Sequence, residues 1–361
     1  MSGRKRILVT GAGGSPSTNF VRSLRESGEP FHLIGVDCNK YYLQRAETDE
    51  RHLVPNANEP DYLDVLRSVI GESGAELVYS QPDPEIEMIS RHRGTLGART
   101  FLPAHRTIEI CQDKFESFRR WKAAGLRVPE TMRIDTEADL ERAFREYGSP
   151  VWLRAIVSPG GGKGSFRAES LHLAKAWMDF SEGWGNFTAA ECLAPESITW
   201  SALWKDGELV VAQGRVRLYW ELGNRAPSGV TGITGTGVTV SDAALDDLAL
   251  RAIRAIDERP NGIFSVDLTY DRRGVPNPTE INIGRFFTTH LFFTRAGLNL
   301  PHLFVKLAFD EPIPPLARTT NPLANDLAWV RGMDFLPVLT DVAAIERPVA
   351  ELAARRARLA R

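Results

Sequence analysis

Two basic residues and a run of glycines lie close together in the segment WLRAIVSPGGGKGSF. Arg154 lies on an apolar stretch with the pattern of a strand, and Lys163 lies among the glycines of 160–164. Glycines free backbone N–H groups to wrap around phosphate oxygens, and the two cations add positive charge. The Walker motif is not matched, because Gly164 follows Lys163. The segment therefore indicates a phosphate-binding loop of another kind, or an exposed hairpin turn.

Three oxygen-bearing side chains form a second group, in the segment FSVDLTYDRRGVPNPTEIN. Asp267 lies on one expected strand, and Glu280 and Asn282 lie two residues apart on its expected hairpin partner. Residues i and i+2 of a strand face the same side, and the DRRG turn folds Asp267 back beside them. Such oxygens suit a hard cation, and Mg²⁺ bridging nucleotide phosphates is the natural choice. A solvated hairpin face is the alternative, which the apolar context of TEINIGRF does not favour.

A third glycine-rich segment, TGAGGSPSTN at 10–19, follows the first apolar run and invites comparison with a dinucleotide site. Pro16 occupies the third glycine position of GxGxxG, and Ser17 occupies it in the TGxxGxxG spacing. Asp37, at the end of the second expected strand, suits a ribose hydroxyl. However, no Tyr-x-x-x-Lys pair supplies the acid of short-chain reductases. An NAD(P)-dependent reductase or epimerase stays as an alternative function.

The expected secondary structure that must hold these groups changes along the chain from alternating strands and helices to antiparallel strands. Up to about residue 100, strand and helix patterns alternate, which predicts a parallel sheet with crossover helices. The segment DKFESFRRWKAAGLRVP predicts an amphipathic helix ended by Gly125. Beyond residue 150, antiparallel strands with turns at KDG and DRRG are expected. The tail AAIERPVAELAARRARLAR predicts a surface helix. The fold class is therefore α/β followed by α+β.

Composition narrows the classes of partner. The 361 residues carry 44 basic and 46 acidic side chains, a net charge of −2, which gives no electrostatic reason to expect nucleic acid. No apolar run approaches the roughly 20 residues that span a bilayer, and the N-terminal apolar stretch is too short for a signal peptide. Cys38, Cys111 and Cys192 show no CxxC spacing and fit a reduced compartment. We expect a cytoplasmic protein without a nucleic-acid or membrane partner.

Taken in order, these segments resemble the ATP-grasp superfamily, in particular proteins similar to the large subunit of carbamoyl-phosphate synthase. The resemblance covers residues 1 to about 310. It implies a parallel-sheet pre-ATP-grasp domain followed by a two-part ATP-grasp fold with antiparallel sheets. The implied parts are a pre-ATP-grasp domain, a subdomain with the glycine-rich lid, a subdomain with the metal hairpin and a C-terminal extension, at 1–110, 111–190, 191–310 and 311–361. Carbamoyl-phosphate synthase has two ATP-grasp halves, whereas this chain has room for one.

The resemblance also implies roles in binding ATP and Mg²⁺. Lys114, in CQDKF, and Arg154 match basic residues that reach the ATP phosphates. Glu191, in AAECLAPES, matches the hinge at which main-chain groups of the next two residues bind adenine. The glycine lid would consist of Gly160, Gly161, Gly162, Lys163 and Gly164. The adenine contacts would be Cys192 and Leu193, and the Mg²⁺ ligands Asp267, Glu280 and Asn282.

Two departures from the family pattern affect the site. Ser197 and Ile198 occupy the places of the usual ribose-binding acid, so Glu196, one residue early, is the candidate substitute. The arginine of the family's Glu-x-Asn-x-Arg pattern is displaced to Arg285 by Gly284, for which we expect a β-bulge that re-aims the arginine.

The implied reaction is ligation of a carboxylate to an amine through an acyl phosphate, with Arg154, Arg285 and Lys163 stabilising the transferring phosphoryl group. The small-molecule substrates have weaker candidate contacts, which are Arg215 and Arg217 for the carboxylate and Asp83 and Glu85 for the amine. A non-catalytic nucleotide-binding protein is a further alternative, and a homodimer is left open.

Overall fold

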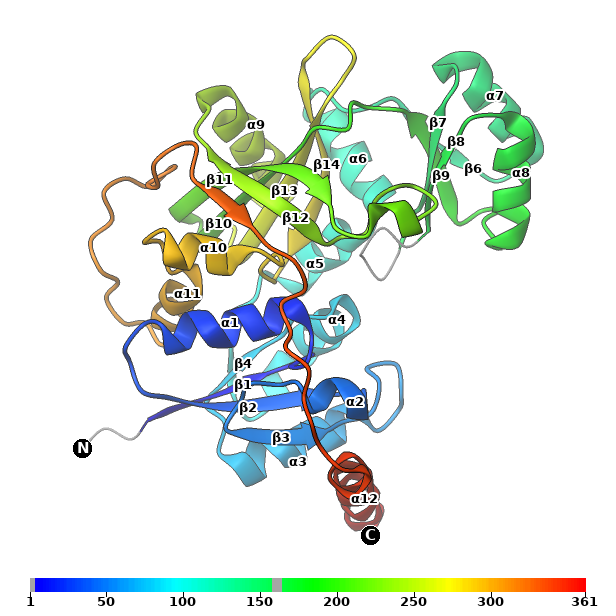
Figure 1. Cartoon of the computed structure of the whole chain (residues 1–361). Helices are drawn as coiled ribbons and strands as arrows, with labels where there is room; N and C mark the ends of the chain where they lie inside the picture. Colours follow the sequence, from blue (N-terminus) through cyan, green and yellow to red (C-terminus); the bar gives the residue numbers. More distant parts are fainter. Residues whose placement is uncertain (1–3, 158–163) are drawn as a thin grey trace.

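The computed structural model describes residues 4–157 and 164–361. Its N-terminal part is a parallel sheet with the strand order β3-β2-β1-β4-β5, in the lower half of Figure 1. The strands are β1 (Lys5–Val9), β2 (Phe31–Asp37), β3 (Glu50–Leu53), β4 (Leu77–Tyr79) and β5 (Arg99–Thr100). The helices among them are α1 (Ser15–Arg25), α2 (Lys40–Leu43), α3 (Tyr62–Ser73), α4 (Asp83–Arg91) and the short 3-10 helix η1 (Arg93–Thr95). All strand pairs are parallel, which confirms the prediction for this region.

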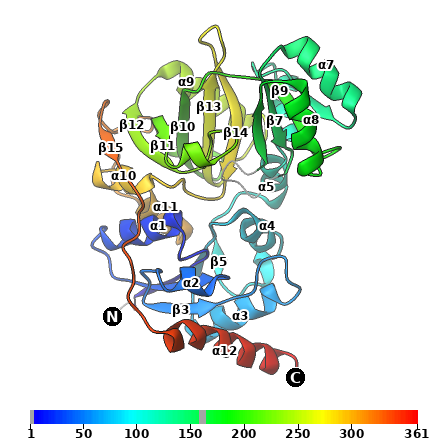
Figure 2. The same cartoon turned by 45° about the vertical axis from the view of Figure 1, so that its right-hand side comes forward.

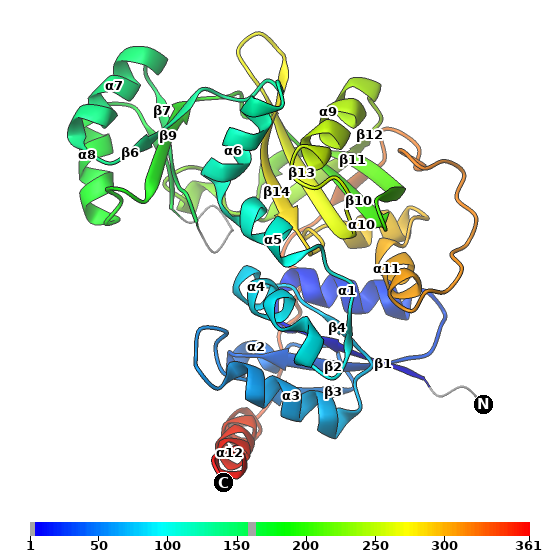
Figure 3. The same cartoon turned by 180° about the vertical axis from the view of Figure 1, so that it is seen from behind.

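Two helices then lead to the next sheets, α5 (His105–Gln112) and α6 (Lys114–Ala123). The carboxylate of Asp113 caps α6 by accepting a hydrogen bond from the backbone N–H of Glu116 at 2.8 Å. Gly125, with φ +72°, follows the end of the helix as expected. Seen from behind, α5 and α6 run along the edge strand of the large antiparallel sheet, β14 (Pro276–Ile283) (Figure 3).

A small antiparallel sheet with the order β6-β9-β7-β8 forms a separate lobe, at the right of Figure 1. Its strands are β6 (Thr131–Ile134), β7 (Val151–Ala155), β8 (Ser165–Ala168) and β9 (Phe187–Glu191), and its helices are α7 (Glu137–Tyr147) and α8 (Leu171–Phe180). The lobe has a hydrophobic core of its own, which includes Leu140, Leu153 and Met178, all fully buried. Because this core is not shared with the rest of the chain, the lobe is a packing unit by itself.

The large antiparallel sheet has the order β14-β13-β10-β11-β12-β15. Its further strands are β10 (Ser197–Lys205), β11 (Glu208–Trp220), β12 (Thr234–Val240), β13 (Gly262–Tyr270) and β15 (Ala328–Val330). The accompanying helices are η2 (Gly223–Arg225), α9 (Ala243–Arg254), α10 (His290–Arg295) and α11 (Leu300–Ala308). The expected antiparallel hairpins at the KDG and DRRG turns are confirmed.

Shared aromatic packing joins the parallel sheet to the large antiparallel sheet. Phe20 of α1 stacks on Tyr79 of β4, with ring centroids 3.8 Å apart, and both lie near Phe286 and Phe304. The backbone N–H of Phe286 donates to the Tyr79 hydroxyl at 3.2 Å. These contacts hold the end of β14 above the carboxyl edge of the parallel sheet, the edge at which open α/β sheets bind ligands.

The C-terminal segment crosses the whole molecule. β15 pairs with β12, and the chain then runs past α1 to the expected terminal helix α12 (Val342–Leu359), which packs against α2, α3 and β3 (Figures 1 and 2). Arg355 and Arg356 form ion pairs with Glu72 and Asp61 of the parallel-sheet region. In the described ranges 4–157 and 164–361, no helix has both the length and the apolar character needed to cross a membrane.

Candidate active site

The β13–β14 hairpin brings the three predicted metal ligands to one face. Asp267 lies directly opposite Glu280, and Asn282 follows two residues later on β14. The Asn282 amide Nδ2 donates to Asp267 Oδ2 at 3.0 Å. Thr199 of β10 donates its hydroxyl to Asp267 Oδ1 at 2.6 Å. The geometry that the spacing predicts is therefore present in the structure.

Two cations from separate elements meet at Glu280. The Arg154 guanidinium, at the end of β7, forms an ion pair with Glu280 Oε2 and donates to the carbonyl of Thr279 at 3.2 Å. Lys114, the first residue of α6, places Nζ 3.6 Å from Glu280 Oε1. The backbone N–H of Lys114 donates to the carbonyl of Ile156 at 3.1 Å, which holds the start of α6 against the chain just after β7. Two elements far apart in sequence thus bring their cations to one carboxylate on a third element, β14.

Electrostatics keep this carboxylate ionised. Burial by itself raises the pKa of Glu280, but the charges of Arg154, Lys114 and Arg285 outweigh burial and lower the pKa to about 2. Burial lowers the pKa of Lys114, although the neighbouring Glu280 opposes the change. At neutral pH the Glu280 carboxylate is therefore ionised. It lies among cations that would also attract the oxygens of a phosphate group.

Gly284 does not form the expected β-bulge before Arg285. The register shift of the β13–β14 ladder lies between Asp267 and Leu268, and β14 already ends at Ile283. Gly284 follows with φ +72°, a left-handed conformation that favours glycine. The bulge prediction was wrong, because a turn after the strand changes the chain direction there. Arg285 then donates from Nη2 to Asn282 Oδ1 at 2.8 Å.

The two acidic residues predicted to contact an amine have different surroundings. Both carboxylate oxygens of Asp83 accept hydrogen bonds from Arg285, at 2.7 and 3.1 Å. Glu85 is buried, burial raises its pKa to about 7, and its neighbours are Thr10 and Tyr62. Their roles toward an amine stay predictions. The structure shows Asp83 holding Arg285, and Glu85 packed beneath the first glycine loop.

The predicted adenine hinge lies between β9 and β10. Glu191 ends β9, and its carboxylate accepts from the backbone N–H of Glu130 at 3.2 Å. The backbone groups of Cys192 and Leu193 form no hydrogen bond within the described part of the chain. Glu196 is exposed on the following loop. These positions fit the predicted hinge, while the roles themselves stay predictions.

Arg215 and Arg217 lie on β11 with their guanidinium groups buried. Arg215 donates to the hydroxyls of Thr234 and Thr199, each at 2.7 Å. Arg217 donates to Thr234 at 2.9 Å and to Ser197 at 2.7 Å. These hydroxyl partners were not predicted, although alternation in SITWSALW places Ser197 and Thr199 on one strand face. That alternation was the available signal.

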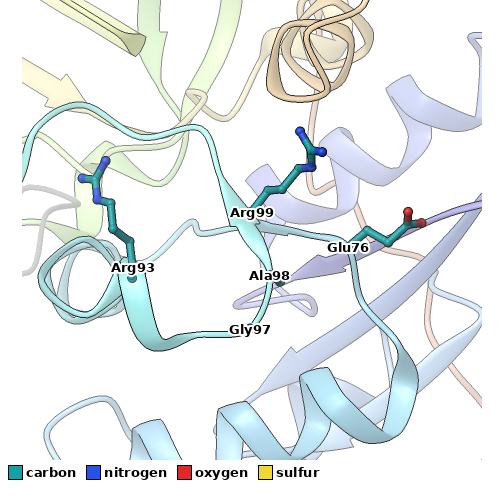
Figure 4. Close-up of a pocket in the computed structure, with 6 residues that line it drawn as sticks. Glu76, Arg93, Gly97, Ala98 and Arg99 are labelled. Carbon is teal, nitrogen blue, oxygen red and sulfur yellow. The ribbon is translucent and has the colours of Figure 1, made fainter.

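A small cavity opens beside the cluster, between α5, α6 and β14. It is lined by Asp83, Cys111, Gln112, Lys114, Glu280, Ile281, Asn282, Ile283 and Arg285. A second hollow is lined by Glu76, Arg93, Gly94, Gly97, Ala98 and Arg99 (Figure 4). The second hollow lies where β4 and β5 begin, at the edge of the sheet opposite to the ligand-binding edge. Its Arg93 is bound by the carbonyls of Ser90 and Leu102, so it has a structural role.

The donor set fits a hard cation. Asp267, Glu280 and Asn282 offer two carboxylates and an amide oxygen from neighbouring positions of one sheet face. Among the described residues, no cluster of three or more His, Cys, Asp or Glu could hold a metal. A divalent cation at the hairpin would therefore also need oxygens from a bound ligand, as Mg²⁺ does on nucleotide phosphates. The predicted lid residues Gly160, Gly161, Gly162 and Lys163 lie outside the described residues, and Gly164, with φ +74°, lies just inside them.

The first glycine loop is occupied by the protein itself. A Cβ at Gly13 would lie 1.9 Å from the backbone oxygen of Tyr42. The backbone N–H of Gly13 donates to Asp37 Oδ2 at 3.0 Å. The carboxylate expected to bind ribose in a dinucleotide site is therefore turned into the loop. The loop glycine accommodates α2, which does not favour a dinucleotide site.

This steric role makes Gly13→Ala a destabilising substitution. We expect the free energy of unfolding to fall by at least about 2 kcal/mol, because the added methyl group meets backbone. Gly71→Ala is the control, since nothing lies within 4 Å of a Cβ there and alanine favours the interior of α3. Urea denaturation measures both. Equal stability of Gly13→Ala and the wild type would mean that the loop is open.

Comparison of the sequence with models of protein families and with curated proteins finds no match. The structure is similar to carboxyaminoimidazole ribonucleotide synthase from Aspergillus clavatus complexed with ATP, with a TM-score of 0.66 and 17% identity, over 88% of this chain and 80% of that chain. It is also similar to the biotin carboxylase domain of 2-oxoglutarate carboxylase from Hydrogenobacter thermophilus, a dimer in complex with MgADP, ADP and bicarbonate. There the TM-score is 0.67 and the identity 16%, over 90% of this chain and 73% of that chain.

A third similar structure is L-amino acid ligase from Bacillus licheniformis, with a TM-score of 0.64 and 14% identity, over 85% of this chain and 75% of that chain. At these identities the likeness shows the fold. The chain has the ATP-grasp fold that the sequence resemblance implies, with one parallel and two antiparallel sheets among the described residues.

Proposed function

We propose that this ATP-grasp chain is an ATP-dependent ligase that activates a carboxylate as an acyl phosphate and joins it to an amine. One observation carries the proposal. Lys114 of α6 and Arg154 of β7, from two separate elements, converge on the ionised Glu280 of the β13–β14 hairpin. A cluster of cations beside a hard-cation donor set is what a triphosphate requires. The ATP and MgADP complexes of the similar structures support the same ligand.

Each group of residues then has a place in the reaction. Lys114 and Arg154 would bind the nucleotide phosphates, and the backbone of Cys192 and Leu193 would bind adenine, with Glu196 near the ribose. Asp267, Glu280 and Asn282 would hold Mg²⁺, which neutralises phosphate charge when bound. The predicted lid residue Lys163 would add a further cation over the phosphates. The boundaries 1–110, 111–190, 191–310 and 311–361 are our proposal for the domains.

The chemistry requires activation because a carboxylate is a poor acylating agent at neutral pH. The substrate carboxylate would attack the γ-phosphate, and an amine would then displace phosphate from the acyl phosphate. Arg154 and Arg285 would offset the charge that develops on the oxygens during both steps. No protein nucleophile is needed. We further propose that the substrates are small molecules and that the protein works in the cytoplasm. A homodimer is left open, since one similar structure is a dimer.

The proposal is tested by thermal stabilisation with MgADP and with NADPH. We expect MgADP at about 100 times its dissociation constant to raise the free energy of unfolding by roughly 2.7 kcal/mol. NADPH at the same concentration should leave the melting temperature unchanged. The matched control is ADP with EDTA, which should stabilise less if the hairpin holds the cation. A shift with NADPH alone would overturn the ligase and favour the reductase alternative.

A further inference from the structure

Two of the buried arginines near the site have no carboxylate partner. Arg215 is 1% exposed and Arg217 is 8% exposed. Within the described part of the chain, both donate only to hydroxyl groups, and Nε of Arg215 has no partner. The residues outside that part, 1–3 and 158–163, contain no Asp or Glu. The pair therefore has no directly bonded anion in the described part of the chain; its nearest carboxylate is Asp267, which Arg215 reaches through the Thr199 hydroxyl.

The neighbouring arginines, by contrast, each have a carboxylate partner. Arg154 pairs with Glu280, and Arg285 pairs with Asp83. Arg331, which donates to the carbonyl of Thr234 at 2.8 Å, pairs with Asp334. A buried guanidinium without a directly bonded anion is costly, and burial lowers the pKa of Arg217 to about 10 although the charges of Asp267 and Glu280 oppose the change. The exception at Arg215 and Arg217 thus calls for an anion supplied by a ligand.

Aromatic rings hold the two guanidinium groups in place. The Arg215 guanidinium lies over the ring of Phe287, 5.0 Å from its centroid. The Arg217 guanidinium lies over Trp220, 3.4 Å from the centroid. Both side chains also donate to the same Thr234 hydroxyl. Such stacking fixes the planar groups without neutralising them, which suits a preformed anion site.

The pair borders the proposed phosphoryl-transfer site. The register places Arg215, Thr199, Asp267 and Glu280 in one row across β11, β10, β13 and β14. Neighbouring strands lie about 4.8 Å apart, so the Cα atoms of Arg215 and Asp267 are about 10 Å apart. Arg215 donates to the Thr199 hydroxyl, which donates to Asp267. An anion on the pair would therefore belong to a molecule that also reaches the metal hairpin.

We propose that the substrate acid carries a second anionic group, a second carboxylate or a phosphate, which Arg215 and Arg217 bind while the first carboxylate is activated. The inference rests on the proposed function. A simple monocarboxylate brings one negative charge, which is consumed at the reacting centre, and leaves both guanidinium groups unpaired. A dianionic acid brings one negative charge to the reacting centre and a second to Arg215 and Arg217. The chemical class is thus a short dicarboxylic acid or a phosphorylated carboxylic acid.

The test measures anion binding by calorimetry in the presence of saturating MgADP. The probes are malonate, succinate, glutarate and inorganic phosphate, with butyrate as the monocarboxylate of succinate's chain length. We expect at least one dicarboxylate or phosphate to bind about tenfold or more tightly than butyrate. A preference for phosphate over all dicarboxylates identifies the second group as a phosphate only if Arg217→Met abolishes it; a preference that survives this variant places phosphate where the reaction releases it and overturns the proposal. Equal affinity for all probes would overturn the proposal.

Variants separate a binding role from a structural one. Arg217→Met should lower the affinity for the preferred dianion about tenfold or more and leave MgADP affinity within about twofold. The melting temperature of the ligand-free variant should stay equal or rise, because an uncompensated charge is removed. Arg251→Met, on the exposed face of α9, is the control and should change neither affinity.

Two further outcomes would overturn the anion site, and a third would overturn the ligase function alone. A fall in MgADP affinity on Arg217→Met would assign the pair to the nucleotide phosphates. A marked loss of melting temperature with unchanged anion affinity would assign it to the fold. If the wild type fails to bind MgADP but binds a dianion in an Arg217-dependent manner, the ligase proposal fails and the anion site stands.

Discussion

Replacing Glu280 with glutamine is expected to lower the free energy of unfolding of the ligand-free protein by about 3 kcal/mol at pH 7. The Glu280 pKa is about 2 in the folded chain against an ordinary 4.5, and each pKa unit corresponds to about 1.4 kcal/mol. Glutamine has nearly the shape of the protonated acid, so the variant lacks only the charge. Arg154 and Lys114 are then left without their shared anion. The same substitution should weaken MgADP binding, because one proposed metal ligand is gone.

The contribution of the Glu280 charge to the free energy of unfolding depends on pH. Because folding lowers the pKa of Glu280, its charge stabilises the fold above the unfolded-state pKa, near 4.5, and the contribution is lost as the pH falls toward 2. The difference in unfolding free energy between wild type and Glu280→Gln should therefore be full at pH 6 to 7 and should shrink below pH 4.5. Urea denaturation at a series of pH values measures it.

The matched control is Glu137→Gln on α7. Glu137 pairs with Lys175 at 2.6 Å, but its side chain is 64% exposed. An exposed pair contributes about 0–1 kcal/mol, so this variant should stay close to wild type at every pH. If Glu280→Gln resembles this control at pH 7, the three cations do not hold Glu280 in the way the geometry indicates.

Residues near one another in sequence made part of this site predictable. The period-two pattern placed Glu280 and Asn282 on one face, and the DRRG turn placed Asp267 opposite, because a short hairpin leaves few alternatives. Strand and helix alternation likewise predicted the parallel sheet. Short elements such as β5, a strand of two residues, carry too little pattern to be recognised. β15 pairs with β12 only because the distant tail returns to that edge.

Contacts between distant residues were beyond sequence reasoning. Arg154 and Glu280 are 126 residues apart, and only the family resemblance placed them in one site. The hydroxyls of Thr199 and Thr234 look like ordinary strand residues until β10, β11 and β12 are aligned. Gly13 has the appearance of a cofactor-binding glycine, yet its neighbour is the backbone of Tyr42. A single sequence gives residue types and spacing, whereas these roles depend on which partner arrives across the fold.

Breaking the ion pair between Asp83 and Arg285 is expected to destabilise the fold about as strongly as Glu280→Gln. The pair joins the start of α4 to the end of the metal hairpin across 202 residues of sequence. The side chains are 16% and 18% exposed, so breaking the pair removes the partner of a mostly buried charge. We expect Asp83→Asn to lower the free energy of unfolding by about 3 kcal/mol, measured by urea denaturation. The freed Arg285 should also hold Asn282 less firmly, which would weaken MgADP binding.

Asp83→Asn and Arg285→Gln should lower the free energy of unfolding by different amounts, and a double-mutant cycle measures how far the two losses are coupled. Arg285→Gln leaves Asp83 in the first turn of α4, where the helix dipole still stabilises a carboxylate. Asp83→Asn leaves a buried guanidinium beside Lys114 and Arg154, the cations that already surround Glu280. Asp83→Asn should therefore be the more destabilising, and the double variant should lose less than the two single losses added together. Additive losses would mean that the two residues act independently and that the pair does not fix the hairpin to the parallel sheet.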